Sequence, residues 1–163
     1  MKKQAASSTL KKVVVVLADR SAVPGYVNPS KLGKSETFDL LTQEGEHRET
    51  ALDDVRCVYF VREFTANYVL ERKAFLSRPK LDGLWVRLKF RDGETLEGVV
   101  TNDLLALLDG GIQITPPDLN GTAVRIFVPR AALSEVTVLG VVGVARRKPA
   151  PAALPAQPKL FSE

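Results

Sequence analysis

The sequence has very little of the chemistry that catalysis requires. Its 163 residues include one cysteine, Cys57, and one histidine, His47. A single cysteine excludes an intrachain disulfide, and one Cys with one His is too few for the four ligands of a structural zinc site. The adjacent carboxylates Asp53 and Asp54 point to opposite faces of an extended chain, so they make a poor acid–base pair. Because a glycine-rich phosphate-binding motif is also missing, we predict a protein that is not an enzyme and has no cofactor.

Long hydrophobic runs are absent as well. The longest, Val13–Ala18 and Leu139–Ala145, have the length of a β-strand and fall far short of the roughly 20 residues that span a bilayer. Lys2 and Lys3 are not followed by the apolar core of a signal peptide. We therefore expect a cytoplasmic protein of bacterial type with no membrane span.

The body of the chain also lacks a basic excess, although the formal net charge is +4. Residues 1–12 and 146–163 together carry eight basic residues and one acidic residue, whereas residues 13–145 carry 15 basic and 18 acidic ones. A domain that grips phosphates usually has its own basic face. Contact with nucleic acid or with an anionic surface is therefore expected to be weak and to come from the tails.

What the sequence does contain is an internal repeat. Leu17–Val27 aligns with Phe90–Val100, with apolar residues, an aspartate and a glycine at matching places, and Ala51–Val55 aligns with Ala132–Val136. An internal repeat indicates one structural unit used twice. Short apolar segments separated by turn residues indicate about five strands in each copy. The predicted fold is mainly β, with two tandem small barrels of the SH3-like or Sm-like kind.

The repeat also sets the predicted domain boundaries. The chain is expected to divide into a disordered basic tail at residues 1–11, a first barrel at 12–64, a linker at 65–84, a second barrel at 85–144, and a disordered tail rich in proline and alanine at 145–163. In the linker, the spacing of Phe64, Tyr68 and Phe75 favours a short amphipathic helix, although the same stretch also permits an extended strand.

Each copy contains a predicted turn followed by a glycine in the returning strand. In the first copy Asp19–Pro24 is expected to form the turn, and in the second the pair Asp92-Gly93 is a hairpin signal. Gly25 and Gly98 occupy the same place after these turns. A glycine at that point lets a strand bend sharply, as a small barrel requires.

The loop after the second strand contains a short motif. Asn28-Pro29-Ser30-Lys31-Leu32-Gly33 resembles the Asn/Asp-x-Ser-x-x-Gly motif of PilZ domains, which bind cyclic di-GMP on a small β barrel. The resemblance implies that Asn28, Ser30 and Gly33 hold a guanine edge and a phosphate. PilZ domains also have an upstream Arg-x-x-x-Arg, and the basic residues at that place in this chain have a different spacing. A solvent-exposed loop without a ligand is the alternative interpretation.

The strand pair in the second copy carries a different resemblance. Val86–Gly98 is similar to the first Sm-type motif, a strand, an Asp-Gly turn, a second strand and a glycine. Sm proteins bind uridine-rich RNA in oligomeric rings. Leu104–Asp109 lacks their usual asparagine, and Arg130 is followed by Ala131 where those proteins have glycine. The resemblance therefore implies the Sm-like fold more than RNA binding.

A longer resemblance covers most of the body. Val58–Phe64, Glu71–Phe75, Val86–Gly98 and Arg125–Val138 are similar to an uncharacterised bacterial family of duplicated small β-barrel domains that are often associated with PilZ domains. This family implies no established activity. Domains of this family often occur together with signalling domains, which implies a regulatory role.

Four basic residues near the junction of the two copies are the best candidates for a binding patch on the body. They are Arg62, Arg72, Lys73 and Arg78. Solvated or ion-paired side chains are the alternative interpretation. The function we expect is that of a non-catalytic adaptor or regulatory protein whose partner is another protein. The two alternatives are a cyclic dinucleotide receptor that uses the Asn28–Gly33 loop and a Sm-like nucleic-acid binder.

Overall fold

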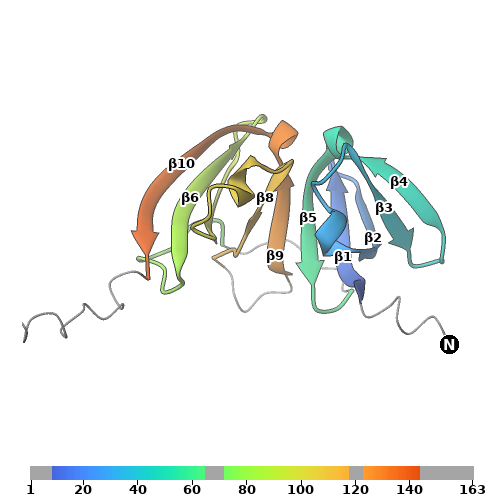
Figure 1. The fold of residues 1–163 in the computed structure, drawn as a ribbon, viewed down its shortest axis with the longest axis horizontal. Coiled ribbons are helices and arrows are strands. Elements are labelled where there is room, and N and C mark those ends of the chain that lie inside the picture. The colour runs from blue at the N-terminus through green and yellow to red at the C-terminus, as the bar shows by residue number, and fades with distance from the viewer. Residues whose placement is uncertain (1–8, 65–71, 118–122, 144–163) are drawn as a thin grey trace, which may run out of the picture.

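The computed structural model describes residues 9–64, 72–117 and 123–143, and these residues are mainly β-structure (Figure 1). The mainly β prediction is thereby confirmed. The strands are β1 Lys11–Leu17, β2 Ala22–Val27, β3 Thr37–Thr42, β4 His47–Ala51, β5 Val55–Val61, β6 Gly83–Phe90, β7 Thr95–Val100, β8 Gly111–Ile114, β9 Ala123–Pro129 and β10 Leu133–Val142. Four short 3₁₀ helices connect them: η1 Pro29–Lys31, η2 Leu52–Asp54, η3 Ala106–Leu108 and η4 Arg130–Ala132.

The strands form two antiparallel sheets, and neither closes into a barrel in the described part of the chain. The larger sheet has the order β4-β3-β2-β1-β5-β9-β8 and the smaller one has the order β10-β6-β7. The prediction of two tandem barrels is not confirmed, because β5 of the first half pairs with β9 of the second, with Val58 opposite Phe127. The first half of the chain therefore shares its sheet with part of the second half, as the side-by-side strands in Figure 1 show.

The two halves nevertheless pair their strands in the same order. In the first half the order is β4-β3-β2-β1-β5. In the second half β10-β6-β7 forms one run and β8-β9 another, and a single antiparallel bridge between Val99 and Thr115 joins β7 to the end of β8. With this bridge included, the second half has the order β9-β8-β7-β6-β10, which matches the first half strand for strand.

The first hairpin turn of each half has the same construction. Its third residue has a positive φ, 74° at Arg20 and 96° at Gly93. The preceding aspartate accepts a hydrogen bond from the backbone two residues ahead, since the N–H of Ser21 donates to Asp19 and that of Glu94 donates to Asp92, both at 2.9 Å. The hydroxyl and the backbone N–H of Ser21 both donate to Asp19 and lower its pKa, and the N–H of Glu94 lowers the pKa of Asp92 in the same way.

The structural correspondence of Ala51–Val55 differs by three residues from the sequence alignment, which paired this segment with Ala132–Val136. Helix η2 leads into β5 at Val55, and helix η4 leads into β10 at Leu133. Val55 therefore corresponds to Leu133, not to Val136. The backbone N–H of Ala18 donates to Asp54 of η2 at 2.9 Å, and Arg91 makes the same bond to Ala132 of η4 at 3.0 Å.

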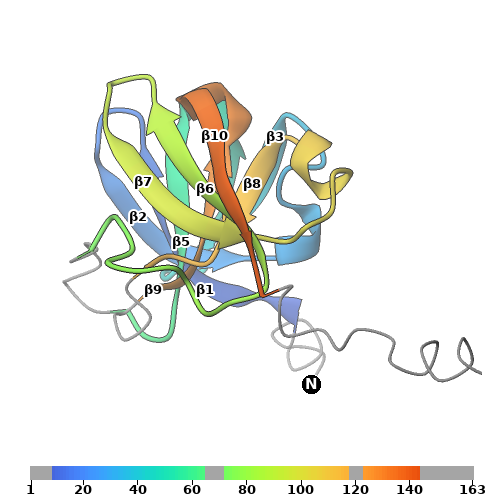
Figure 2. The same ribbon diagram turned by 90° about the vertical axis from the view of Figure 1, so that its left-hand side faces the viewer.

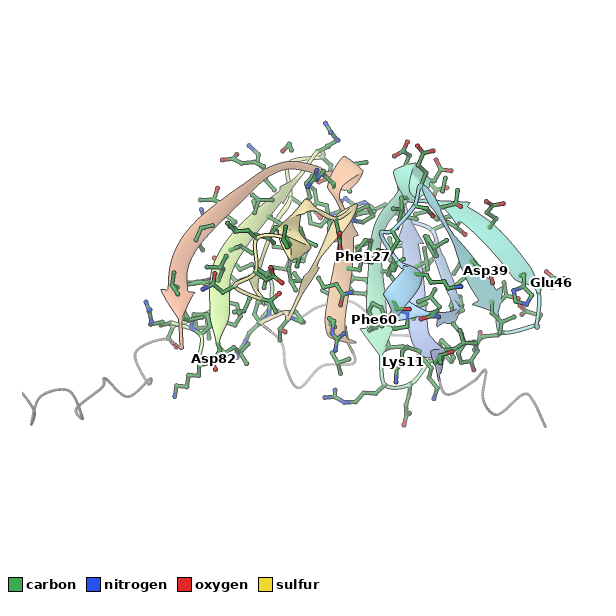
Figure 3. All side chains as sticks on the ribbon, in the orientation of Figure 1. Lys11, Asp39, Glu46, Phe60, Asp82 and Phe127 are labelled. Carbon is green, nitrogen blue, oxygen red and sulfur yellow. The ribbon has the colours of Figure 1, made fainter. Side chains whose placement is uncertain are left out.

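Two hydrophobic cores share the strands in the middle of the molecule. Val13 and Val15 of β1 belong to the core of the first half, whereas Val16 packs into the core of the second. This arrangement confirms the expectation that the valine run of β1 is buried on both faces. Phe127 comes from the second half but packs into the first core, and Figure 3 shows it with Phe60 in the middle of the molecule.

Gly25 and Gly98 hold corresponding places, as expected, and both permit close contact between strands. A Cβ atom on Gly25 would lie 2.5 Å from the carbonyl oxygen of Leu41 in β3. One on Gly98 would lie 2.8 Å from the side chain of Ile114 in β8. A larger residue at either position would push the second strand of its half away from the third.

The segment before β6 has no regular secondary structure over residues 72–82. The predicted linker helix falls mostly on residues 65–71, which lie outside the described residues. Phe75 packs edge-on against Trp85, with ring centroids 6.3 Å apart. The indole N–H of Trp85 donates to Glu97 Oε1 at 3.0 Å, and the backbone N–H of Phe75 donates to the same oxygen. Trp85 therefore anchors this segment to β6 and β7.

Candidate functional site

A cleft of about 520 Å³ lies where the β2–β3 loop of the first half meets β7 and β8 of the second. Much of its lining is buried and apolar: Leu32, Val99, Val100, Ile112, Ile114 and Phe127. Polar residues also line it: Ser30, Lys34, Thr101, Asp109, Gln113, Thr115 and Arg125. The combination of an apolar surface and a few polar groups is typical of a binding site.

The β2–β3 loop that forms one wall of the cleft is built by local hydrogen bonds. Asn28 caps η1, because its Oδ1 accepts bonds from the backbone N–H of Ser30 at 3.1 Å and from the Ser30 hydroxyl at 2.8 Å. Leu32 is buried in the first core and anchors the loop. Of the three residues predicted to hold a nucleotide, Ser30 lines the cleft, whereas Asn28 and Gly33 do not.

Gly33 instead joins the loop to the second half of the chain. It has a φ of 86°, a conformation that favours glycine, and its carbonyl oxygen accepts a hydrogen bond from the N–H of Gly110 at 3.1 Å. A Cβ atom on Gly110 would lie 2.8 Å from that oxygen. Beside this contact Lys34 forms an ion pair with Asp109 at 2.9 Å. The two loops therefore hold each other at the edge of the cleft.

Arg125 is held in place by groups from both halves. Its guanidinium donates to the Oε1 of Gln113 at 3.3 Å and lies 5.8 Å from the ring centroid of Phe60. The charge of Lys34 is compensated by Asp109, whereas Arg125 contributes a positive charge whose printed partners are a neutral amide and an aromatic ring. An apolar ligand surface suits it better than a highly charged one.

The four basic residues predicted to form one patch are distributed over the surface. Arg72 and Arg78 line one shallow cavity, and Lys73 lines a different one. Arg78 donates to the carbonyl oxygen of Val141 at 2.5 Å. Arg62 follows β5, and its carbonyl accepts a bond from Lys12 at 3.5 Å. The structure therefore brings together only Arg72 and Arg78 in the lining of one cavity.

Sequence reasoning missed a group of ion pairs between the two halves. Arg56 of β5 contacts Asp92 at 2.6 Å and Glu94 at 2.5 Å, and Arg20 contacts Asp92 at 2.8 Å. The guanidinium of Arg56 also lies 4.0 Å from the ring centroid of Phe90. The acidic residues belong to the β6–β7 turn, which is far from Arg20 and Arg56 in the sequence. No local sequence pattern therefore predicts these partners. The neighbouring Glu94 raises the pKa of Arg20, which keeps its charge.

The single cysteine is buried, and the single histidine lies on the surface beside a carboxylate. Burial raises the pKa of the Cys57 thiol to about 11, so the reactive thiolate is scarce at neutral pH. His47 is exposed on β4 and lies 2.7 Å from Asp39. Within the described ranges, no group of three or more His, Cys, Asp or Glu side chains is placed to hold a metal ion.

Residues 9–140 match the family of unknown function DUF6982, and the chain belongs to this family. Comparisons with curated proteins and with solved structures gave no match. The resemblances to PilZ-associated and Sm-like barrels therefore remain predictions. None of the helices in the described residues has the length and apolar character needed to cross a membrane.

Proposed function

We propose that this member of DUF6982 is a non-catalytic adaptor or regulatory protein that binds a short apolar segment of another protein in the cleft between its halves. The observation that carries the proposal is the lining of the cleft, where buried apolar side chains lie beside the ion pair between Lys34 and Asp109. Burying one large aliphatic side chain there would contribute about 1.5–3 kcal/mol. Two or three such side chains would contribute about 3–9 kcal/mol to the binding free energy.

The β7–β8 loop extends this apolar surface. Leu104 and Leu105 are 71% and 74% exposed, and Leu107 of the same loop lines the cleft. Large apolar side chains that are exposed next to a cleft are typical of protein interaction sites. Neither Leu104 nor Leu105 belongs to either core, so both are available to a partner at little cost to folding.

The test is capture of partners from the native host with the full chain, followed by direct binding measurements with the partner found. Replacing both leucines, Leu104→Asp with Leu105→Asp, should weaken binding at least tenfold because it puts charge on the apolar surface. Leu76→Asp is the matched control, because Leu76 is 81% exposed and lies on a different loop. Equal affinity of the two variants would contradict the proposal.

A cyclic dinucleotide is the second candidate ligand, and the position of Ser30 in the cleft favours it. Arg125 lines the same cleft and offers a guanidinium for stacking or phosphate contact. Titration of the full chain with cyclic di-GMP distinguishes the two candidates. Binding in the micromolar range that Ser30→Ala weakens would support the receptor. Absence of binding in that range removes it.

The matched strand order, turns and backbone bonds support a further part of the proposal, that residues 12–64 and 85–144 are two copies of one small Sm-like or SH3-like unit. The hairpin turns Ala18–Ser21 and Arg91–Glu94 have the same length and the same hydrogen bonds. Replacing the first by the sequence of the second should therefore preserve the circular dichroism spectrum. A loss of β-structure on this exchange would count against equivalent turns.

A further inference from the structure

Strand β10 is an open edge of the smaller sheet. It is ten residues long and pairs on one side with β6, and Figure 2 shows it running along the outside of the molecule. The edges of β7 and β8 meet at the bridge between Val99 and Thr115. Among the described strands, β4 and β10 are then the two remaining sheet edges. An open edge offers unpaired backbone groups to another strand.

Three valines of β10 are exposed on the face that belongs to the core. Val136, Val138 and Val141 are 42%, 55% and 42% exposed. Residues directly opposite each other in an antiparallel pair share one face of the sheet. The residues opposite these valines in β6 are the buried Leu88, Val86 and Leu84. The apolar face of β10 is therefore exposed at these three positions, beside core residues that are themselves buried.

The corresponding strand of the first half shows how such an edge is covered. Counted from the first residue of each strand, Val58 and Phe60 of β5 correspond to Val136 and Val138 of β10. Val58 and Phe60 are 0% and 5% exposed. They are covered because β9 pairs with β5 and places Phe127 opposite Val58. In the first half, the strand that corresponds to β10 is thus covered by an additional strand, β9.

Strand β4 of another copy is unsuited to this place, although it corresponds to β9. Glu49 of β4 stands opposite Asp39 of β3, just as Phe127 of β9 stands opposite Gln113 of β8. Pairing of β10 with β4 would therefore put the carboxylate of Glu49 against the exposed valines. His47, Arg48 and Glu49 are all exposed, and such charged residues are typical of edges that resist pairing.

We propose that β10 pairs antiparallel with β10 of a second copy of this chain, around a two-fold axis at Thr137. This register places Val136 of each copy opposite Val138 of the other, on one continuous apolar face. Glu135 then stands opposite Leu139, so no like charges meet. The paired span lies short of Val141, whose carbonyl oxygen is already bonded to Arg78. The two smaller sheets become one continuous sheet across the dimer.

Sedimentation velocity of the full chain over a range of concentrations tests the dimer. The expected mass is twice the 17.8 kDa of one chain, and Val138→Lys should reduce it to one chain by placing a charge at the edge. Glu49→Lys on β4 is the matched control and should remain dimeric. A wild-type chain that stays at 17.8 kDa, or a Val138→Lys variant that stays dimeric, would overturn the proposal. A normal circular dichroism spectrum verifies that each variant is folded.

Cysteine crosslinking tests the register with variants that keep the edge neutral. Cys57 is buried, so wild type should not crosslink under mild oxidation or with a short bifunctional maleimide. Thr137→Cys should give crosslinked dimers, because the two-fold axis brings both copies of this residue together. Arg48→Cys on β4 should stay uncrosslinked. Preferential crosslinking of Thr137→Cys to Arg48→Cys in a mixture would replace the two-fold arrangement by a head-to-tail one and overturn the proposal.

Discussion

Two of the contacts between the halves of the chain, one charged and one made by backbone groups, differ in their chemistry. In one, Arg20 and Arg56 meet Asp92 and Glu94, and the adjoining cavity measures about 180 Å³. In the other, the Gly33–Gly110 backbone bond holds two loops together and leaves the cleft of about 520 Å³. Long charged side chains fill the first junction, whereas glycines bring the backbones together at the second without filling the space beside them. The second junction is therefore the one suited to binding.

Phe127→Ala should have the largest effect, because this side chain serves the first core and also lines the cleft. Phe127 is 2% exposed, so truncation leaves a large cavity and should lower the free energy of unfolding by about 3–5 kcal/mol. Urea denaturation measures the loss. Leu104→Ala, on an exposed loop, is the control and should change stability by less than about 0.5 kcal/mol. Equal midpoints for the two variants would contradict the assignment of Phe127 to the first core.

Arg56→Ala breaks the charged junction and should lower the free energy of unfolding by about 1–3 kcal/mol, because it leaves two carboxylates without their closest partner. The Arg56 side chain is 13% exposed, whereas that of Arg20 is 54% exposed. Arg20→Ala should therefore cost less. The same denaturation measurement compares them, and a larger loss for Arg20→Ala would show that the more exposed arginine carries the contact.

Acid should weaken the charged junction selectively. Hydrogen bonding from Glu94 and the charges of Arg56 and Arg20 lower the pKa of Asp92 in the folded chain. A carboxyl with a lowered pKa contributes stability above its unfolded pKa, and this contribution is lost as the pH falls from about 4 through the folded value. Urea midpoints measured from pH 6 to pH 2.5 should fall less steeply for Asp92→Asn than for wild type. Parallel curves would show that the pKa of this carboxyl is the same in the folded and unfolded states.

Lys34→Ala should have the smallest effect, because both partners of this ion pair are more than a third exposed. Exposed pairs contribute about 0–1 kcal/mol, so the urea midpoint should barely move. Loss of more than about 1 kcal/mol would mean that the contact between the two loops depends on charge. The Gly33–Gly110 backbone bond would then not be the main contact at this junction.

The strands were largely predictable because each shows a local pattern. The valine run of β1 and the alternation of Val86, Leu88 and Phe90 in β6 fall in strands, as expected. Strand β2 begins at Ala22, within the predicted turn Asp19–Pro24. Pro24 is tolerated there because the pairing of β2 with β3 covers only Gly25 and Tyr26, so the missing N–H of Pro24 removes no bond on that side.

The contacts between the halves could not be predicted in the same way. Arg56 and Asp92 are 36 residues apart, and no periodic pattern relates them. The apolar residues of β5 and β9 indicate burial but do not specify which strand each edge will pair with. The motif at Asn28–Gly33 lies in the loop that forms one wall of the cleft, yet the backbone contact between Gly33 and Gly110 depends on the fold.

The pairing of β5 with β9 has a consequence for the order in which the protein can be made. Phe127 leaves the ribosome 66 residues after Val61, the last residue of β5. At about 5–20 residues per second, the first half waits roughly 3–13 s for the side chain that completes its core. During synthesis the edge of β5 is therefore bare. We expect the nascent first half to be the stage at which this chain depends most on chaperones.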